Sequence, residues 1–106
     1  MMWLFTEKGF YSAVQHDEDE EIIVVRSRLR GDMENILPLL GNPTILVNAG
    51  TDYAFRVYVP RTVWSKAVET MTNEIDYTNF KNAVHDGTSR DAAYMRVWSA
   101  MASLQR

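Results

Sequence analysis

Alternating and β-branched apolar positions in the first half of the chain predict two strand hairpins. The strongest strand signal is the run Ile22-Ile23-Val24-Val25, because β-branched side chains favour extended backbone. The predicted strands are 10–16, 21–29, 44–48 and 53–59. The first two would pair around an acidic loop at 17–21, and the last two around a turn at 49–52. Before them, Trp3-Leu4-Phe5 is a short apolar stretch that ends at a turn signal, Glu7-Lys8-Gly9.

Apolar residues at helical spacing predict helices after each hairpin. The first helix would begin at Asp32 as its N-cap and end before Gly41, and Pro38 inside its apolar stripe predicts that it is short or kinked. The other predicted helices open at 60–62, cover 79–85 and follow a cap at Thr88 to about 104. The residues expected to be buried in the longer two are Trp64, Ala67, Val68, Met71, Ile75, Tyr94, Val97, Trp98, Met101 and Leu104.

The order of these elements, ββαββ followed by two or three helices, predicts an α+β fold. We expect a two-layer sandwich in which an antiparallel sheet of about four strands carries the helices on one face, as in a ferredoxin-like or related fold. A chain of 106 residues is typical of one domain, so a single α+β domain is predicted over 1–106.

The composition excludes several kinds of site. No cysteine is present, which excludes disulfides, thiolate catalysis, cysteine-ligated zinc and iron–sulfur clusters. The apolar N-terminal residues stop at Thr6-Glu7-Lys8, too soon for a secretory signal, and no apolar run approaches the roughly 20 residues of a membrane span. We therefore expect a soluble protein that is cytoplasmic, or delivered to a cytoplasm, and that has no membrane partner.

Charge is unevenly distributed along the chain. Five consecutive acids, Asp17-Glu18-Asp19-Glu20-Glu21, leave nine acids against eleven Lys and Arg in the rest. This acidic run is expected to aid solubility or to contact a basic partner. His16 adjoins the run, but neighbouring strand residues point to opposite faces, and the run lacks the ligand spacing of a calcium loop. No metal site is therefore predicted.

Alternation along the strands leaves arginine and tyrosine on the sheet face away from the helices. The residues expected on this open face are Arg26, Arg28, Arg56 and Tyr58, with Ile22 and Val24 beside them. Tyr53 is expected on the opposite, core face with Phe55 and Val57. The first strand contributes one of two sets to the open face, either Phe10, Ser12 and Val14 or Tyr11, Ala13 and Gln15. Alternation alone does not decide between the two sets.

An open face of this kind has three interpretations. Its arginines could pair with acids across the strands, an arrangement that is common and contributes little stability. It could be a protein interface, in which Arg and Tyr are the enriched anchors. It could also bind single-stranded nucleic acid, with rings stacked on bases and arginines on phosphates, although no RNP-like aromatic motif is present.

The segment around Asn79 is a second candidate for binding, because polar and aromatic residues stand together between two predicted helices. Tyr77 and Lys81 are the other candidate residues there. The alternative is that Tyr77 packs with Phe80 under the last helix while Lys81 is solvated. His85 is expected to interact with a helix end. No serine lies in a nucleophile-elbow motif and no glycine loop could hold a phosphate, so no catalytic residue and no cofactor are predicted.

Seven short motifs cover much of the chain: Trp3-Leu4-Phe5-Thr6, Gly9-Phe10-Tyr11-Ser12-Ala13-Val14, Val25-Arg26-Ser27-Arg28, Asp52-Tyr53, Arg56-Val57, Ile75-Asp76-Tyr77-Thr78-Asn79-Phe80-Lys81 and Tyr94-Met95-Arg96-Val97-Trp98. Together they resemble a family of small bacterial and bacteriophage proteins with no assigned function. The resemblance implies a stand-alone domain in a bacterial or phage setting, and it implies no activity.

The functional prediction is a small non-catalytic interaction or regulatory module that binds a protein partner or itself as a homo-oligomer. Binding of single-stranded nucleic acid through the open Arg/Tyr face is the alternative. The two differ in salt dependence, because the affinity of a protein for nucleic acid falls steeply as salt rises.

Overall fold

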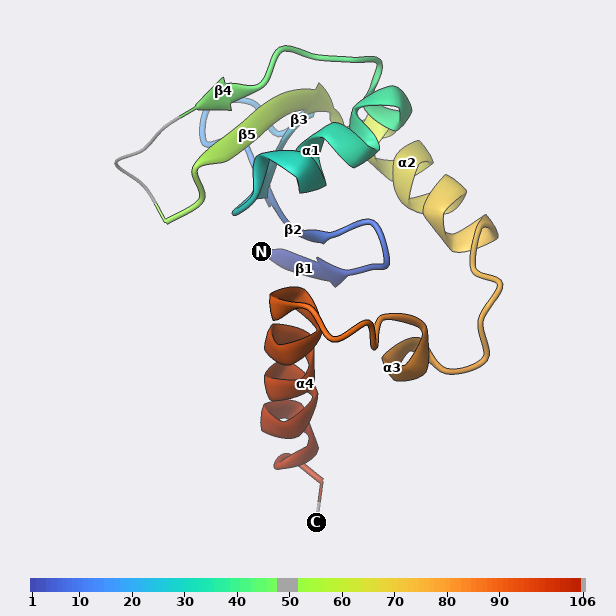
Figure 1. Ribbon diagram of the computed structural model, residues 1–106. Coiled ribbons are helices and arrows are strands. Elements are labelled where there is room, and N and C mark those ends of the chain that lie inside the picture. The colour runs from blue at the N-terminus through green and yellow to red at the C-terminus, as the bar shows by residue number, and fades with distance from the viewer. Residues whose placement is uncertain (48–51, 106) are drawn as a thin grey trace. The chain divides into compact units, whose positions relative to one another are not determined.

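The computed structural model describes residues 1–47 and 52–105 (Figure 1). Its contacts divide the chain into two compact units, Met1–Ile75 and Asp76–Arg106. The first unit holds a sheet with its helices, and the second holds two further helices. Residues 49–51 of the predicted turn and residue 48, the end of the strand predicted before it, lie outside the described residues.

The first unit contains a five-stranded antiparallel sheet. Its strands are β1 (Met2–Phe5), β2 (Phe10–Gln15), β3 (Ile22–Ser27), β4 (Leu46–Val47) and β5 (Phe55–Pro60). They follow the order β1-β2-β3-β5-β4 (Figure 1). Both predicted hairpins are confirmed, because β2 pairs with β3 and β4 pairs with β5. The α+β class is confirmed as well, although three strands precede the first helix, unlike the β-α-β-β-α-β order of a ferredoxin-like fold.

The strand beyond the expected four is β1, which the sequence shows only as a short apolar stretch. It lies at one edge of the sheet and pairs with β2. Thr6 holds the turn between them, because its Oγ1 donates to the carbonyl oxygen of Gly9 at 2.9 Å and accepts the Gly9 N–H at 3.1 Å. A strand of four residues is too short for alternation to distinguish it from a loop.

Helices cover one face of this sheet. Helix α1 spans Arg30–Ile36, a 3₁₀ helix spans Leu37–Leu40, and α2 spans Arg61–Asn73. The predicted break near Pro38 is confirmed, and Gly41 ends the 3₁₀ helix with a φ of 81°, a conformation that favours glycine. The core shared by sheet and helices contains Tyr11, Ala13, Ile23, Val25, Met33, Ile36, Leu40, Val57, Val59, Trp64, Ala67 and Met71.

Asp32 is not the N-cap that the sequence predicts. Helix α1 starts earlier, after Leu29, which makes no side-chain cap bond. Asp32 is buried, and its Oδ2 accepts the N–H of Phe10 at 3.2 Å while its carbonyl oxygen accepts the Tyr11 hydroxyl at 2.8 Å. The carboxylate therefore satisfies a main-chain donor of β2, a long-range role that a local capping pattern does not reveal.

The second unit contains α3 (Phe80–Ala83) and α4 (Ser89–Ala102). The predicted cap of α4 is confirmed, because Thr88 Oγ1 accepts the N–H of Asp91 at 3.3 Å. Within residues 1–47 and 52–105, no helix is long and apolar enough to cross a membrane.

The prediction of buried side chains is wrong for much of α4 and for the end of α2. Tyr94 is buried, but Trp98, Met101 and Leu104 are 55%, 59% and 74% exposed, and Ile75 is 53% exposed. The second unit offers α4 little more than the four residues of α3 and its flanking segments. An apolar stripe is buried only where another element packs on it, so helical spacing overstates the core here.

Candidate interaction surface on the sheet

The strand register places Arg26, Arg56 and Tyr58 on the face of the sheet opposite the core, and Arg28 follows the end of β3. Arg26 lies across from Arg56, and Val24 lies across from Tyr58. Between them in sequence, Val25 and Val57 face the core as a pair. The structure also shows which residues of β2, the first strand predicted from the sequence, lie on this face. Tyr11 and Ala13 are core residues, so alternation places Phe10, Ser12 and Val14 on the other side. We call this side the open face; its strand residues are Trp3, Phe5, Phe10, Ser12, Val14, Ile22, Val24, Arg26, Arg56 and Tyr58.

Three arginines surround Tyr53 at one end of the open face. The Cζ atoms of Arg26 and Arg28 lie 4.6 Å and 4.4 Å from the centroid of the Tyr53 ring, and Arg56 Nη2 donates to the Tyr53 carbonyl oxygen at 3.4 Å. We call Arg26, Arg28 and Arg56 the arginine cluster. Tyr53 was expected on the core face, and that prediction is wrong. Strand β5 begins only at Phe55, so its alternation does not extend back to Tyr53.

The arginine cluster contains an unfavourable pairing of like charges. Arg26 and Arg56 are direct partners across β3 and β5, and like charges in that position destabilise a sheet. The other cross-strand partner of Arg26 is Ser12, whose Oγ accepts from Arg26 Nη2 at 2.8 Å. The predicted alternative of an acid across from Arg26 therefore does not hold, and the Nε of Arg26 is buried without a hydrogen-bond partner. A cluster of this kind favours an anionic group from outside the sheet.

Aromatic rings extend the open face toward the β1 edge. Phe5 stacks on Phe10 with ring centroids 4.6 Å apart, and Trp3 meets the same Phe10 ring edge-on at 6.1 Å. Trp3 is 56% exposed and Tyr58 is 43% exposed. Phe10 belongs to one of the two sets that the sequence offers for this face, whereas Phe5 was not among the candidate residues. The place of Phe5 on the open face depends on the pairing of β1 with β2, which the sequence pattern did not predict.

The acidic loop lies at the opposite end of the same strands. Arg61 holds it through main-chain oxygens, because its Nε donates to the Glu20 carbonyl at 2.9 Å and its main-chain N–H donates to that of Glu21 at 2.6 Å. The side chain of Asp17 is 91% exposed. No group of three metal-ligating side chains occurs in the described ranges. Hence Arg61 fixes the loop without neutralising its carboxylates by direct ion pairing.

His16 connects the acidic loop to the open face. Its Nδ1 accepts the N–H of Glu18 at 3.0 Å, and its ring meets the ring of Tyr58 edge-on with centroids 5.5 Å apart. This role needs no metal ion. The histidine therefore shapes the start of the loop and supports an exposed tyrosine of the open face.

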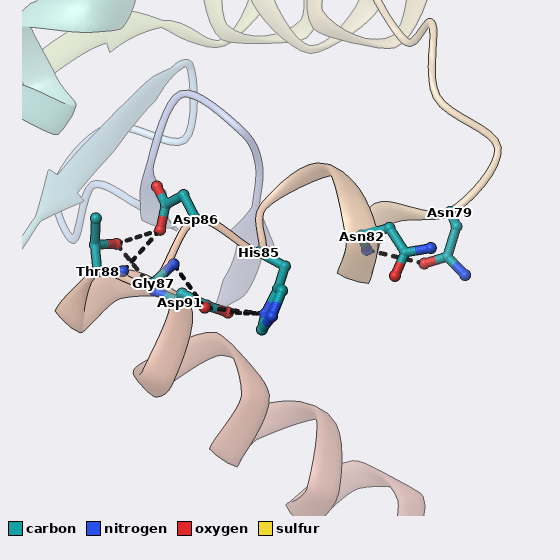
Figure 2. Close-up of polar contacts among 7 residues, drawn as sticks. All are labelled: Asn79, Asn82, His85, Asp86, Gly87, Thr88 and Asp91. Atoms are coloured by element: carbon teal, nitrogen blue, oxygen red, sulfur yellow. Dashed lines mark hydrogen bonds and ion pairs between the residues drawn. The ribbon is translucent and has the colours of Figure 1, made fainter.

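The candidate residues around Asn79 lie in the second unit and have local structural roles there. Asn79 caps α3, because its Oδ1 accepts the N–H of Asn82 at 3.1 Å (Figure 2). Tyr77 packs against Phe80 at 5.6 Å between ring centroids. Lys81 is not simply solvated, because its Nζ lies 4.3 Å from the centroid of the Trp98 ring. These contacts give each of the three candidate residues a partner within the second unit.

His85 and Asp86 make local polar contacts at the start of α4. His85 Nδ1 lies 3.0 Å from a carboxylate oxygen of Asp91, which also accepts the N–H of Gly87 at 3.0 Å (Figure 2). The His85 side chain therefore contacts the first turn of α4 through this buried carboxylate, and not the end of the preceding helix as the sequence predicts. The Thr88 hydroxyl and main-chain N–H both donate to Asp86 and hold its pKa below the usual aspartate value.

Comparison with known proteins identifies no relative: no protein-family model, no curated protein and no solved structure matches the chain. The resemblance to a family of small bacterial and phage proteins therefore stays a prediction. The functional argument depends on the geometry of the open face.

Proposed function

We propose that the protein is a small non-catalytic interaction module whose open face binds a protein surface that is acidic and partly apolar. The observation that carries this proposal is the clustering of Arg26 and Arg28 on the Tyr53 ring, on the same face as the exposed rings of Trp3 and Tyr58. Within residues 1–47 and 52–105 no ion pair involves Arg28, and a carboxylate on a partner protein would pair with its guanidinium group.

The composition of the open face supports a protein partner. Trp, Tyr and Arg are the residues that contribute most binding energy in protein interfaces, and all three types are present here. Trp3 and Tyr58 are exposed, whereas Val24, which lies across from Tyr58 on the same face, is buried. Aromatic side chains that are held on strands of a sheet lose little conformational entropy on binding.

Single-stranded nucleic acid fits the open face less well. Stacking of bases needs free ring faces, yet Phe5 and Phe10 stack on each other and the Tyr53 ring is covered by Arg26 and Arg28. The acidic loop at the other end of the face would also repel phosphates. These features support a protein rather than a nucleic-acid partner, within the bacterial or phage cytoplasm that the sequence suggests.

Removal of the two exposed rings tests the proposal. We expect the variant Trp3→Ser/Tyr58→Ser to capture at least about tenfold less of a specific partner protein than wild type does, in cells that produce the chain. The reason is that truncation of an interface anchor costs about 2 kcal/mol or more of binding free energy. Capture is quantified by mass spectrometry. The matched control is Trp98→Ser, which removes an exposed tryptophan of the second unit and should capture as wild type does.

Two results would contradict the proposal. One is a capture pattern that is the same for wild type and the Trp3→Ser/Tyr58→Ser variant. The other is tight, salt-sensitive binding of labelled single-stranded DNA or RNA, measured by fluorescence anisotropy, that is lost in Arg26→Ala/Arg28→Ala. The second result would assign the open face to nucleic acid instead.

A further inference from the structure

We infer that the acidic, partly apolar surface bound by the open face belongs to a second copy of this chain. The acidic loop of each copy would lie on the arginine cluster of the other. This inference rests on the proposed function, and it goes further by identifying the partner and its orientation.

The first step is the placement of opposite charges at opposite ends of one face. Ile22 borders the acidic loop, and Arg26 lies four residues along β3, which corresponds to about 13 Å at the usual rise of a strand. Tyr58, which contacts His16 just before the loop, lies between the two ends. The open face therefore has a negative end, an apolar middle and a positive end.

The second step is symmetry. In a two-fold interface, each contact of one residue with another occurs twice. When two such faces meet with their β3 strands antiparallel, the negative end of each copy lies over the positive end of the other. Parallel stacking would instead oppose like charges. A charge order along one strand thus selects the antiparallel arrangement, and both charge contacts form together.

The third step is the availability of both charged groups. Among residues 1–47 and 52–105, no ion pair involves Arg28. Its Nη1 donates at 2.6 Å to the carbonyl oxygen of Asp52, which is an uncharged acceptor. In the loop, Arg61 binds main-chain oxygens. Asp19 Oδ1 accepts the Glu21 N–H and Asp17 Oδ1 lies 3.4 Å from His16 Nδ1, and residues 17–21 are all exposed. Each end of the face thus keeps its charge for the other copy.

A charge-swap experiment tests the inference. We expect sedimentation equilibrium to show a dimer of the full chain, with a dissociation constant at least about tenfold weaker in Arg28→Glu and in Asp17→Lys/Glu18→Lys, because each variant places like charges together. An equimolar mixture of the two variants should restore dimerisation to within about threefold of wild type. Arg96→Glu makes the same charge change at an exposed site of α4 and should dimerise as wild type does.

Three outcomes would overturn the inference: a wild-type monomer at every concentration, variants that dimerise as wild type does, or a mixture that is no tighter than either variant alone. Circular dichroism of each variant excludes unfolding as the cause. The proposed function is judged separately. If the wild type is monomeric but its protein capture still depends on Trp3 and Tyr58, the partner is not a second copy and the proposed interaction module stands. If the wild type is monomeric and its capture does not depend on these two residues, both the inference and the proposed function are wrong.

Discussion

Replacement of Gly9 by Ala is expected to lower the free energy of unfolding of the first unit by about 3 kcal/mol or more. Gly9 has a φ of 155°, and a Cβ at this position would lie 2.5 Å from the Cγ of Asp32. The Asp32 carboxylate accepts the N–H of Phe10, so its displacement leaves a donor of β2 unsatisfied. Backbone strain costs about 1–3 kcal/mol and an unsatisfied buried group about 1–3 kcal/mol.

The measurement is urea denaturation followed by far-ultraviolet circular dichroism, with Gly31→Ala as the control. Nothing lies within 4 Å of a Cβ built at Gly31, and this residue lies in α1, where alanine is favoured over glycine by about 1 kcal/mol. The control should therefore be as stable as wild type or slightly more stable. If Gly9→Ala also unfolds within about 0.5 kcal/mol of wild type, the close approach of the β1–β2 turn to α1 is wrong.

Replacement of Ile36 by Ala is expected to lower the same free energy by about 3–4 kcal/mol. Ile36 has no exposed surface and belongs to the core between α1 and the sheet. Truncation of a fully buried isoleucine removes apolar contact and leaves a cavity, which together cost about 2–5 kcal/mol. Unfolding in urea, read by the loss of circular dichroism, measures the change.

Ile75→Ala is the matched control for Ile36→Ala because it makes the same chemical change at a side chain that is 53% exposed. Its effect should stay below about 0.5 kcal/mol. Equal losses at the two positions would show that the core does not lie between α1 and the sheet.

The central strands and their core could be predicted because the physical signals there are local. The run Ile22-Ile23-Val24-Val25 marks β3, and alternation then assigns Val25 and Val57 to the core and Arg26 and Arg56 to the open face. Trp64 is buried as its helical spacing indicates. At these positions the side-chain pattern and the backbone period are enough to predict the element and the face on which each side chain lies.

The remaining features depend on partners that are distant in sequence. The opposition of Arg26 and Arg56 is a consequence of strand register, and residue type alone does not specify which positions lie across from each other. Tyr53 is buried against Arg26 and Arg28 and is not part of the core cluster between sheet and helices. Asp32 serves the main chain of β2 rather than its own helix.

The apolar stripe of α4 was predicted to be buried, but most of it is exposed. Trp98, Met101 and Leu104 have the spacing of buried residues, yet their own unit contains too little chain to cover them. Spacing shows which face of a helix is apolar, and burial depends on what packs against that face.

The most direct test of the open face as a protein interface is photo-crosslinking from its centre. A benzoylphenylalanine placed at Tyr58 should form covalent adducts with protein in cells that produce the chain, and the adduct with a second copy should have twice the mass of the chain. The same probe at Ser65, an exposed position of α2, is the control and should give only background. Equal labelling from the two positions, or no protein adduct from Tyr58, would contradict the account.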